Sequence, residues 1–303
     1  MELAIVGLGR MGGNMARRLH RAGHRVVAFN RSPEKTREIM AEGLEGVFTP
    51  AEVVATLAAP RIVWIMVPAG DATESTIEEF AALLSPGDTI VDGGNSNFHD
   101  SKRRHASLAA RGLRFVDAGI SGGVWGLQNG YGTMVGGDRD AVAPLEPIFL
   151  ALAPEGGYIH CGPAGSGHYT KMVHNGIEYG LMQAYAEGLA LLRAKSDLQL
   201  DVAKIAESWR HGTVIRSWLL DLTAEILAED DRLEAIAPVV ADSGEGRWTA
   251  IESVELGVPT PVMTLALMER FASQGHDDFS NRVLARLRQS FGGHAVTRDN
   301  SKG

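Results

Sequence analysis

One short stretch of the sequence places four side chains that can exchange protons or form hydrogen bonds on a single helix face. Residues 171–179 read Lys-Met-Val-His-Asn-Gly-Ile-Glu-Tyr, and apolar residues at helical spacing predict a helix from about residue 167 into the 190s. Positions i, i+3, i+4 and i+7 share a face, and here they are Lys171, His174, Asn175 and Glu178. An ion-paired surface stripe would also fit these residues, so the rest of the chain must decide.

Lys171 and Glu178 carry side chains that could act as a base and as an acid. A lysine, with an ordinary pKa of about 10.4, becomes a base at neutral pH only when it is desolvated or lies beside another cation. A glutamate delivers a proton only as the neutral acid, which burial favours. The two residues are roughly 10 Å apart along the helix axis, at about 1.5 Å per residue. Long side chains can close that gap, so we predict that both face one cleft.

The start of the chain carries the fingerprint of a dinucleotide-binding domain. A buried strand at residues 3–6 leads into a glycine-rich turn and then a helix at 14–21. The first glycine permits the tight turn, the second lets a pyrophosphate approach the backbone, and the third allows close helix–strand packing. Free amides at the helix N-terminus bind the phosphates. The predicted cofactor-binding residues of the turn are Gly7, Leu8, Gly9, Arg10, Met11 and Gly12.

The end of the second strand, residues 25–29, bears on the choice between NADP and NAD. A site for NAD usually carries Asp or Glu there, to accept from the ribose 2′-hydroxyl. This chain has Asn30, Arg31 and Ser32 instead, which offer one cation and two donors. That set suits a 2′-phosphate and favours NADP. The alternative is that Arg31 stacks on the adenine and either cofactor fits.

Strands that alternate with helices through the first half predict an α/β Rossmann-type fold with a doubly wound parallel sheet. Further strands are expected at 61–67, 88–92 and 113–117. Ligands of such sheets bind beyond the carboxyl ends of the strands. The loops there add Val67, Pro68 and Ala69 as cofactor-binding residues, and Asn95 as a residue that orients the nicotinamide or a substrate hydroxyl. The alternative for Asn95 is a simple turn role.

A glycine-rich segment at 119–137 keeps aliphatic and aromatic anchors, so it is an ordered loop and strand and not a flexible linker. Ser121, Gly122 and Gly123 present backbone amides and a hydroxyl, which suits a carboxylate. A glycine-rich turn without a ligand is the alternative. A helix at 138–152 and a strand near 158–160 complete the domain, and residues 162–167 form a hinge.

The second half shows helical spacing only, so an all-α C-terminal domain follows the sheet. We expect residues 1–165 to form the dinucleotide-binding domain and 166–303 to form the all-α domain. Three arginines of this half, Arg216, Arg247 and Arg288, could face a phosphate. Taken singly, each is also compatible with an ordinary surface position.

Composition excludes several classes of protein. A formal charge of −8 and the lack of a basic run argue against nucleic acid as a partner. The apolar run at 62–67 is too short to span a membrane. The histidines show no metal-ligand spacing, so no metal is expected. The single cysteine, Cys161, rules out an intramolecular disulfide and fits a reducing, cytoplasmic location.

The combined pattern resembles the β-hydroxyacid dehydrogenase superfamily and, within it, the decarboxylating 6-phosphogluconate dehydrogenases. The resemblance extends over essentially the whole chain, but the chain is shorter than the commonest members and has one copy of the helical domain, like the short-chain form. Where the long form has a lysine before Trp-Thr, this chain has Arg247. The matching motifs are Gly93-Gly94-Asn95-Ser96, Ser121-Gly122-Gly123, residues 171–179, Ile215-Arg216-Ser217 and Arg288…His294.

This resemblance implies oxidation of 6-phosphogluconate by NADP or NAD, with loss of CO2, to ribulose 5-phosphate. Lys171 would be the base, Glu178 the acid, and Asn175 and His174 would hold substrate hydroxyls. Ser121, Gly122 and Gly123 would hold the carboxylate. The phosphate would be held by Tyr179, Arg216, Arg247 and Thr249, with Arg288 and His294 from a second subunit. The protein would therefore be a homodimer or homotetramer, with residues 166–303 as its substrate and dimerisation domain, in the pentose phosphate pathway or in gluconate breakdown.

Two other functions compete with this interpretation. A non-decarboxylating reductase or dehydrogenase for hydroxyisobutyrate or tartronate semialdehyde would use Lys171, Asn175 and Ser121, but it would need neither Glu178 nor clustered arginines. A catalytically silent NADP-sensing module would need none of these side chains. Release of CO2 separates the first alternative from decarboxylation.

Overall fold

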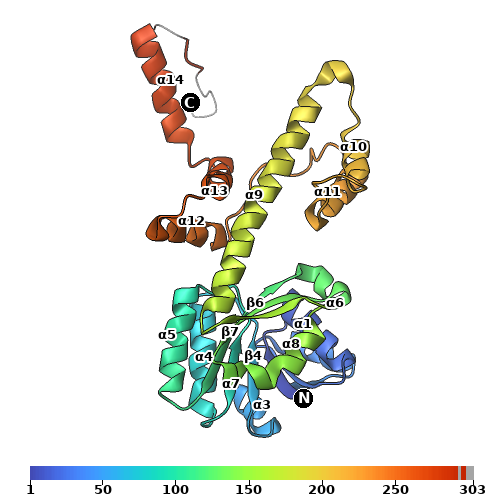
Figure 1. The fold of residues 1–303 in the computed structure, drawn as a ribbon, viewed down its shortest axis with the longest axis vertical. Helices are drawn as coiled ribbons and strands as arrows, with labels where there is room; N and C mark the ends of the chain where they lie inside the picture. The colour runs from blue at the N-terminus through green and yellow to red at the C-terminus, as the bar shows by residue number, and fades with distance from the viewer. Residues whose placement is uncertain (293–294, 298–303) are drawn as a thin grey trace. The chain divides into compact units, whose positions relative to one another are not determined.

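The computed structural model describes residues 1–292 and 295–297 and divides into two compact units, Met1–His174 and Asn175–Gly303. The first unit is built around a sheet and the second consists of helices (Figure 1). This confirms the predicted fold class, a Rossmann-type α/β domain followed by helices. The predicted division at residue 165, directly before the long helix α9 (Ser166–Ala194), stays a prediction.

The sheet of the first unit has eight strands in the order β3-β2-β1-β4-β5-β6-β7-β8. Neighbouring strands are parallel except β6 and β7, which are antiparallel. A short connection cannot cross over the sheet, so the glycine-rich segment returns as a hairpin. The strands are β1 (Glu2–Val6), β2 (Arg25–Phe29), β3 (Glu45–Val47), β4 (Ile62–Ile65), β5 (Thr89–Asp92), β6 (Arg114–Ser121), β7 (Gly132–Gly137) and β8 (Tyr158–Gly162).

Helices cover both faces of this sheet (Figure 1). The predicted helix at 138–152 is broken into three short pieces, because Pro144 and Pro147 lack the amide hydrogen that a continuous helix needs. The helices are α1 (Arg10–Arg21), α2 (Pro33–Ala41), α3 (Pro50–Thr56), α4 (Asp71–Leu83), α5 (Phe98–Ala109), α6 (Gly126–Asn129), α7 (Arg139–Val142) and α8 (Glu146–Leu152), with 3-10 turns η1 (Gly123–Trp125) and η2 (Ala143–Leu145).

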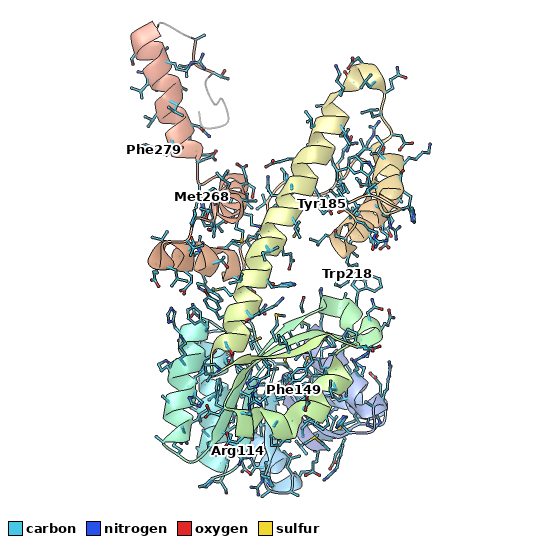
Figure 2. The ribbon with its side chains drawn as sticks, viewed as in Figure 1. Arg114, Phe149, Tyr185, Trp218, Met268 and Phe279 are labelled. Carbon is cyan, nitrogen blue, oxygen red and sulfur yellow. The ribbon has the colours of Figure 1, made fainter. Side chains whose placement is uncertain are left out.

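Alternation along the central strands creates a separate core on each face of the sheet. In β1, Leu3 and Ile5 join the cluster that contains Phe149 of α8, whereas Ala4 and Val6 join the cluster on the opposite face. Phe149 is fully buried in the first of these cores (Figure 2). Because both faces are covered, the central strands read as continuous apolar runs. These two cores fix the strand ends that carry the predicted site loops.

The helical unit is built along the remainder of α9. One small apolar cluster joins α9 to α12 and α13 through Tyr179 and Leu267, and another joins it to α10 and α11 through Leu189 and Leu227. Over the part of the chain that the structure describes, no helix is both long and apolar enough to span a membrane. The further helices are α10 (Val202–Trp209), α11 (Trp218–Glu229), α12 (Glu245–Leu256), α13 (Pro261–Ser273) and α14 (Asp278–Gly292), with the 3-10 turn η3 (Ser196–Leu198).

Candidate active site

The glycine-rich turn after β1 has the shape that a pyrophosphate requires. Gly7 has a φ of 97°, and a side chain there would overlap the backbone oxygen of Met66. A side chain at Gly12 would overlap the backbone of Gly7, so the helix lies directly against the turn. Nothing lies within 4 Å of the position that a Cβ of Gly9 would occupy. The backbone is therefore open at Gly9, where α1 begins, and these residues fit a dinucleotide.

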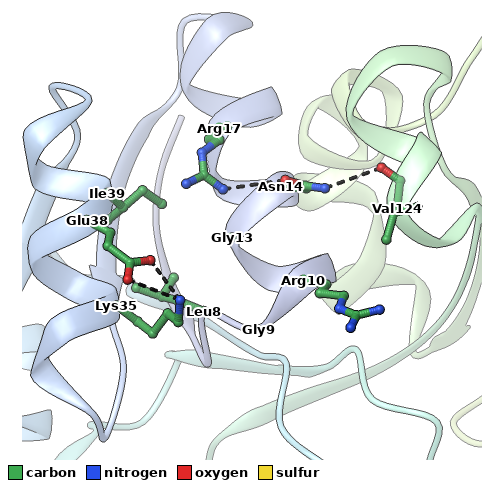
Figure 3. Close-up of a pocket in the computed structure, with 10 residues that line it drawn as sticks. All are labelled: Leu8, Gly9, Arg10, Gly13, Asn14, Arg17, Lys35, Glu38, Ile39 and Val124. Carbon is green, nitrogen blue, oxygen red and sulfur yellow. Dashed lines mark hydrogen bonds and ion pairs between the residues drawn. The ribbon is translucent and has the colours of Figure 1, made fainter.

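A pocket with a volume of about 470 Å³ lies at this turn (Figure 3). Its wall includes Lys35 of α2, which the sequence reasoning missed, although it stands in the first turn after Ser32. Lys35 pairs with Glu38 at 2.8 Å, and both side chains are about half exposed. Such an exposed pair is weak and can be exchanged for a ligand phosphate. The pocket is lined by Leu8, Gly9, Arg10, Gly13, Asn14, Arg17, Lys35, Glu38, Ile39 and Val124.

Asn30, at the end of β2, holds the glycine turn in place. Its Oδ1 accepts from the Leu8 amide at 2.8 Å, and its Nδ2 donates to the Ser32 carbonyl at 3.1 Å. Both the oxygen and the nitrogen of the Asn30 carboxamide therefore form hydrogen bonds within the protein. Of the three residues predicted to meet a ribose 2′-phosphate, Arg31 and Ser32 are the exposed ones.

The loop at the carboxyl end of β4 carries the predicted cofactor residues Val67, Pro68 and Ala69. Val67 is half-buried, whereas Pro68 and Ala69 are exposed. The hydroxyl of Thr73, in the first turn of α4, donates to the Pro68 carbonyl at 2.9 Å. This bond fixes the loop against the helix that follows it.

A buried ion pair positions Asn95 in the loop after β5. Asp92 is fully buried, and its Oδ2 accepts from Arg104 of α5 at 2.9 Å, while its Oδ1 accepts from the Gly94 amide at 3.1 Å. Arg104 also donates to the Ser96 hydroxyl at 3.2 Å. Asn95 lies between these anchored residues and is exposed. Sequence reasoning missed Asp92 and Arg104, because their pairing depends on how α5 packs on the sheet.

The loop after β6 lies beside the dinucleotide turn. Ser121 ends β6, and the next residues open the short turn η1. The carbonyl of Val124 in this turn accepts from Asn14 Nδ2 of α1 at 3.3 Å, which ties the two segments together. Ser121 and Gly122 are half-buried and Gly123 is exposed. The structure thus brings the predicted carboxylate loop and the predicted phosphate turn to one edge of the sheet.

A buried carboxylate anchors the start of α9 on the sheet. Asp117 of β6 is fully buried, and its two oxygens accept from the amides of Gly165 and His168 at 2.6 and 2.8 Å. A carboxylate here satisfies amides that the first turn of a helix leaves unpaired. Two residues further along β6, a Cβ at Gly119 would overlap Lys171 Cβ. Lys171 is consequently packed against the strand and only 7% exposed.

We expect Gly119→Ala to lower kcat by about 10²-fold, because the added methyl group pushes the Lys171 backbone away from β6. Overpacking of this kind also costs about 1–3 kcal/mol of stability, so a thermal melt must accompany the assay. Gly188→Ala is the matched control, because Gly188 lies in α9 with nothing within 4 Å of the added atom. A folded Gly119→Ala protein with the wild-type kcat would contradict this account of how Lys171 is placed.

The four residues of the predicted stripe lie on the continuous helix α9 but differ in exposure. Lys171 and Asn175 are buried, at 7% and 9% exposure. Glu178 is half-buried, and His174 is exposed. A solvated ion-paired stripe would leave all of its members in water, so the burial of Lys171 and Asn175 argues against that alternative.

In the helical unit, the N-terminus of α12 adds polar groups around Tyr179. The Tyr179 hydroxyl lies 3.1 Å from the Ser243 hydroxyl, and the Arg270 guanidinium lies 3.4 Å from the centre of the Tyr179 ring. Arg247 donates to Asp242 through Nε and Nη2 at 3.0 and 2.9 Å. Burial alone would raise the pKa of Asp242, but the Gly244 amide and the Arg247 guanidinium outweigh it and lower the pKa below its usual range.

Arg270, Asp242 and Ser243 were missed from the sequence. Arg270 lies 91 residues after Tyr179 in the chain, and only the packing of α13 on α9 brings the two together. A basic residue in the last turn of a helix, near an aromatic residue of another helix, gives no local pattern. Such a contact can be predicted only when the packing of the helices is known.

The other residues predicted to hold a phosphate lie in different places. Thr249 is buried, and its hydroxyl donates to the Glu245 carbonyl at 2.8 Å. Arg216 is exposed in the turn before α11, where the Tyr185 hydroxyl contacts the neighbouring Ser217 hydroxyl at 2.8 Å. Tyr185 and Tyr179 are six residues apart on α9, so they point to faces about 120° apart. The described contacts therefore do not bring Arg216 to Tyr179.

The two predicted residues of the C-terminal segment cannot both be placed. Arg288 lies on α14 and is exposed. His294 lies outside the described residues. Their predicted role in a second subunit stays a prediction.

Comparison with known proteins shows the family to which both halves of the chain are similar. The profile of the "NAD binding domain of 6-phosphogluconate dehydrogenase" matches residues 2–162, and that of the "6-phosphogluconate dehydrogenase, C-terminal domain" matches residues 167–301. The chain is 44% identical, over 98% of its length and 99% of the relative's, to the NAD(+)-dependent, decarboxylating 6-phosphogluconate dehydrogenase of Haloferax volcanii.

Solved structures show the same likeness. Plasmodium falciparum 6-phosphogluconate dehydrogenase, studied in its apo form and with NADP+ and 6-phosphogluconate, matches with a TM-score of 0.84 and 29% identity, over 100% of this chain and 67% of that one. A 3-hydroxyisobutyrate dehydrogenase from Salmonella typhimurium matches with a TM-score of 0.77 and 23% identity, over 91% of this chain and 95% of that one, which shows a shared fold.

The fold and the glycine turn define an NAD(P)-binding oxidoreductase. The chain belongs to the 6-phosphogluconate dehydrogenase family. Its length matches that of the Haloferax relative, as the predicted short-chain form requires.

Proposed function

We propose that this protein oxidises and decarboxylates 6-phosphogluconate to ribulose 5-phosphate and CO2, with reduction of NADP or NAD. The observation that carries the proposal is the burial of Lys171 against Gly119 of β6, and Gly119 comes two residues before Ser121. On the same helix, Glu178 follows Lys171 by two turns. A base and an acid on one helix face are what an oxidation followed by a decarboxylation needs. Simple oxidation of a hydroxy acid needs only the base.

The first step removes two hydrogens from C3 of the substrate. A bound nicotinamide supplies the acceptor for the C3 hydride. Lys171, as the neutral amine, takes the proton of the C3 hydroxyl. Asn175 and His174 hold the neighbouring hydroxyls, and the Ser121 loop holds the C1 carboxylate. The product of this step is a 3-keto acid.

The second step breaks the bond between C1 and C2 and releases C1 as CO2. The bonding electrons move into the C3 carbonyl, and the Lys171 ammonium stabilises the developing oxyanion and protonates it. The enediol that results must gain a proton on the former C2 and lose the proton of the hydroxyl on the former C3. Glu178, half-buried on the same helix, delivers a proton to that carbon as the neutral acid, while Lys171 takes back the proton of the hydroxyl on the former C3, which gives the ketone of ribulose 5-phosphate.

The substrate phosphate would meet the cluster around Tyr179 at the start of α12. Tyr179, Arg247 and Arg270 bring two guanidinium groups and a hydroxyl to one place in the helical unit. Arginine suits a phosphate because its planar donors match the phosphate oxygens. Asp242 orients Arg247 before a phosphate arrives. Thr249 and Arg216 stay predicted phosphate residues.

An assay of reduced cofactor with alternative substrates tests the proposed function. We expect 6-phosphogluconate to support rapid reduction, and 3-hydroxyisobutyrate and tartronate semialdehyde to support little or none. Equal or better rates with an unphosphorylated acid would overturn the proposal in favour of the non-decarboxylating alternative. The same assay with NADP and NAD settles cofactor preference. We propose NADP, supported by Arg31 in the loop after β2 and by Lys35 of α2, although the Haloferax relative is named as NAD(+)-dependent.

We propose further that the protein works as a homodimer or homotetramer in the cytoplasm. Large apolar side chains of the last two helices are exposed, such as Leu265 at 63%, Phe279 at 77% and Leu284 at 58%. Phe279 is labelled in Figure 2. Apolar surface of this extent is typical of a protein interface. The single cysteine supports a reducing compartment.

Mixed oligomers test whether Arg288 completes the neighbour's site. In a shared site, one chain supplies Lys171 and the neighbouring chain supplies Arg288. A dimer that combines a Lys171→Met chain with an Arg288→Ala chain therefore retains one complete site, which has the unchanged Lys171 of one chain and the unchanged Arg288 of the other. After the two variants are unfolded and refolded together, we expect about a quarter of the wild-type activity at low substrate concentration, because half of the randomly assembled dimers are mixed. Activity that stays at the average of the separate variants would show that each chain builds its own site.

A further inference from the structure

A second carboxyl group, Glu245, lies buried beside Asn175. Glu245 is the first residue of α12 and is 3% exposed. Its Oε1 accepts from Asn175 Nδ2 at 3.0 Å, and its Oε2 accepts from the Ser243 hydroxyl at 2.5 Å. A carboxyl group is costly to bury unless its oxygens find donors. Both oxygens of Glu245 find one, so its position is well defined.

These hydrogen bonds determine which end of the Asn175 side chain faces Glu245. A carboxylate accepts hydrogen bonds and does not donate them, so it selects the amino group of the carboxamide. The carbonyl oxygen Oδ1 then lies on the other arm of the planar amide. An amide without such a partner can turn over, which exchanges an acceptor for a pair of donors.

The same carboxylate is linked to Tyr179. Because Ser243 gives its single hydroxyl hydrogen to Glu245, the Tyr179 hydroxyl must be the donor in its 3.1 Å contact with Ser243 or in its 3.4 Å contact with Asp242. The Ser243 amide donates back to the Tyr179 oxygen at 3.3 Å. Glu245 thus accepts directly from Asn175 and is linked to Tyr179 through Ser243. One buried group holds side chains that the proposed reaction uses at two parts of the substrate.

We propose that Glu245 is a positioning residue, which keeps the carbonyl oxygen of Asn175, and not its amino group, directed at the substrate hydroxyls. An oxygen there accepts the hydrogen of a hydroxyl group and orients it, whereas an amino group would compete with that hydrogen. The inference rests on the proposed function. Glu245 lies 70 residues from Asn175 in the chain, and the pairing exists only because the start of α12 packs against α9.

Glu245→Met tests this role, because methionine has a similar length and no oxygen. We expect kcat with 6-phosphogluconate to fall by about 10²-fold, while the KM for NADP stays unchanged. Glu245→Gln keeps an acceptor for Asn175 and should recover most of the loss. Glu255→Met, an exposed position on the same helix, is the control and should behave as wild type.

A double-mutant cycle with Asn175→Ala shows whether Glu245 acts through Asn175. When Asn175 is absent, Glu245→Met should change kcat by less than about threefold. Losses that multiply in the double variant, or a single Glu245→Met variant within about threefold of wild type, would overturn the inference. If thermal melting shows that Glu245→Met does not fold, Glu245→Asp, which withdraws the carboxylate by one methylene, replaces it under the same criteria. A wild-type protein without activity on 6-phosphogluconate would instead overturn the proposed function.

Discussion

Replacing Lys171 by methionine should abolish oxidation of 6-phosphogluconate, with a loss in kcat of about 10³-fold or more. Methionine fills the same buried space against β6 but cannot accept the proton of the C3 hydroxyl. Without that base, hydride loss would leave a positively charged carbonyl oxygen. Reduced cofactor should still bind, because Lys171 lies outside the pocket at the glycine turn.

Two measurements give this prediction its controls. Lys195→Met changes an exposed lysine just beyond the end of α9, so its kcat should equal that of the wild type. Thermal melting of Lys171→Met should show a folded protein, since methionine is unbranched and apolar. If the folded Lys171→Met variant retained more than about a tenth of the wild-type kcat, another group would have to be the base.

Replacing Glu178 by glutamine should lower kcat by about 10²-fold or more through loss of the final proton delivery. Glutamine keeps the size and hydrogen-bonding reach of the side chain but has no acidic proton at neutral pH. Because Glu178 acts after the oxidation, the first turnover should still release CO2. The enediol left behind should then escape and acquire its proton from water.

The fate of a deuterium label separates this role from a general loss of activity. In D2O, we expect the wild type to place deuterium at C1 of ribulose 5-phosphate in a single configuration, because one side chain delivers it from one side. Glu178→Gln should give both configurations. Glu187→Gln, at an exposed position on the same helix, should match the wild type in rate and configuration. An unaltered rate and a single configuration in Glu178→Gln would remove Glu178 from the mechanism.

The sequence was sufficient for the parts of the fold that rest on local pattern. The glycine turn, the central strands and α9 each show a period or a residue spacing that only one kind of element satisfies. β3 was not predicted, because three residues, Glu45–Val47, are too few to display a period. The antiparallel direction of β7 was also missed, since strand direction depends on how the chain returns and not on the strand's own residues.

The candidate site was predictable only in its local parts. Lys171, Asn175 and Glu178 could be predicted as candidates because a single helix sets their spacing. Arg104, Arg270 and Glu245 escaped notice because each meets its partner, Asp92, Tyr179 and Asn175 respectively, only through the packing of separate elements.

The ratio of CO2 to reduced cofactor is the most direct test of the central claim, that one helix carries both the base for oxidation and the acid that follows decarboxylation. With 6-phosphogluconate labelled with carbon-13 at C1, we predict that every molecule of NADPH formed is accompanied by one molecule of labelled CO2 and one of ribulose 5-phosphate. NADPH formed without labelled CO2 would contradict the account.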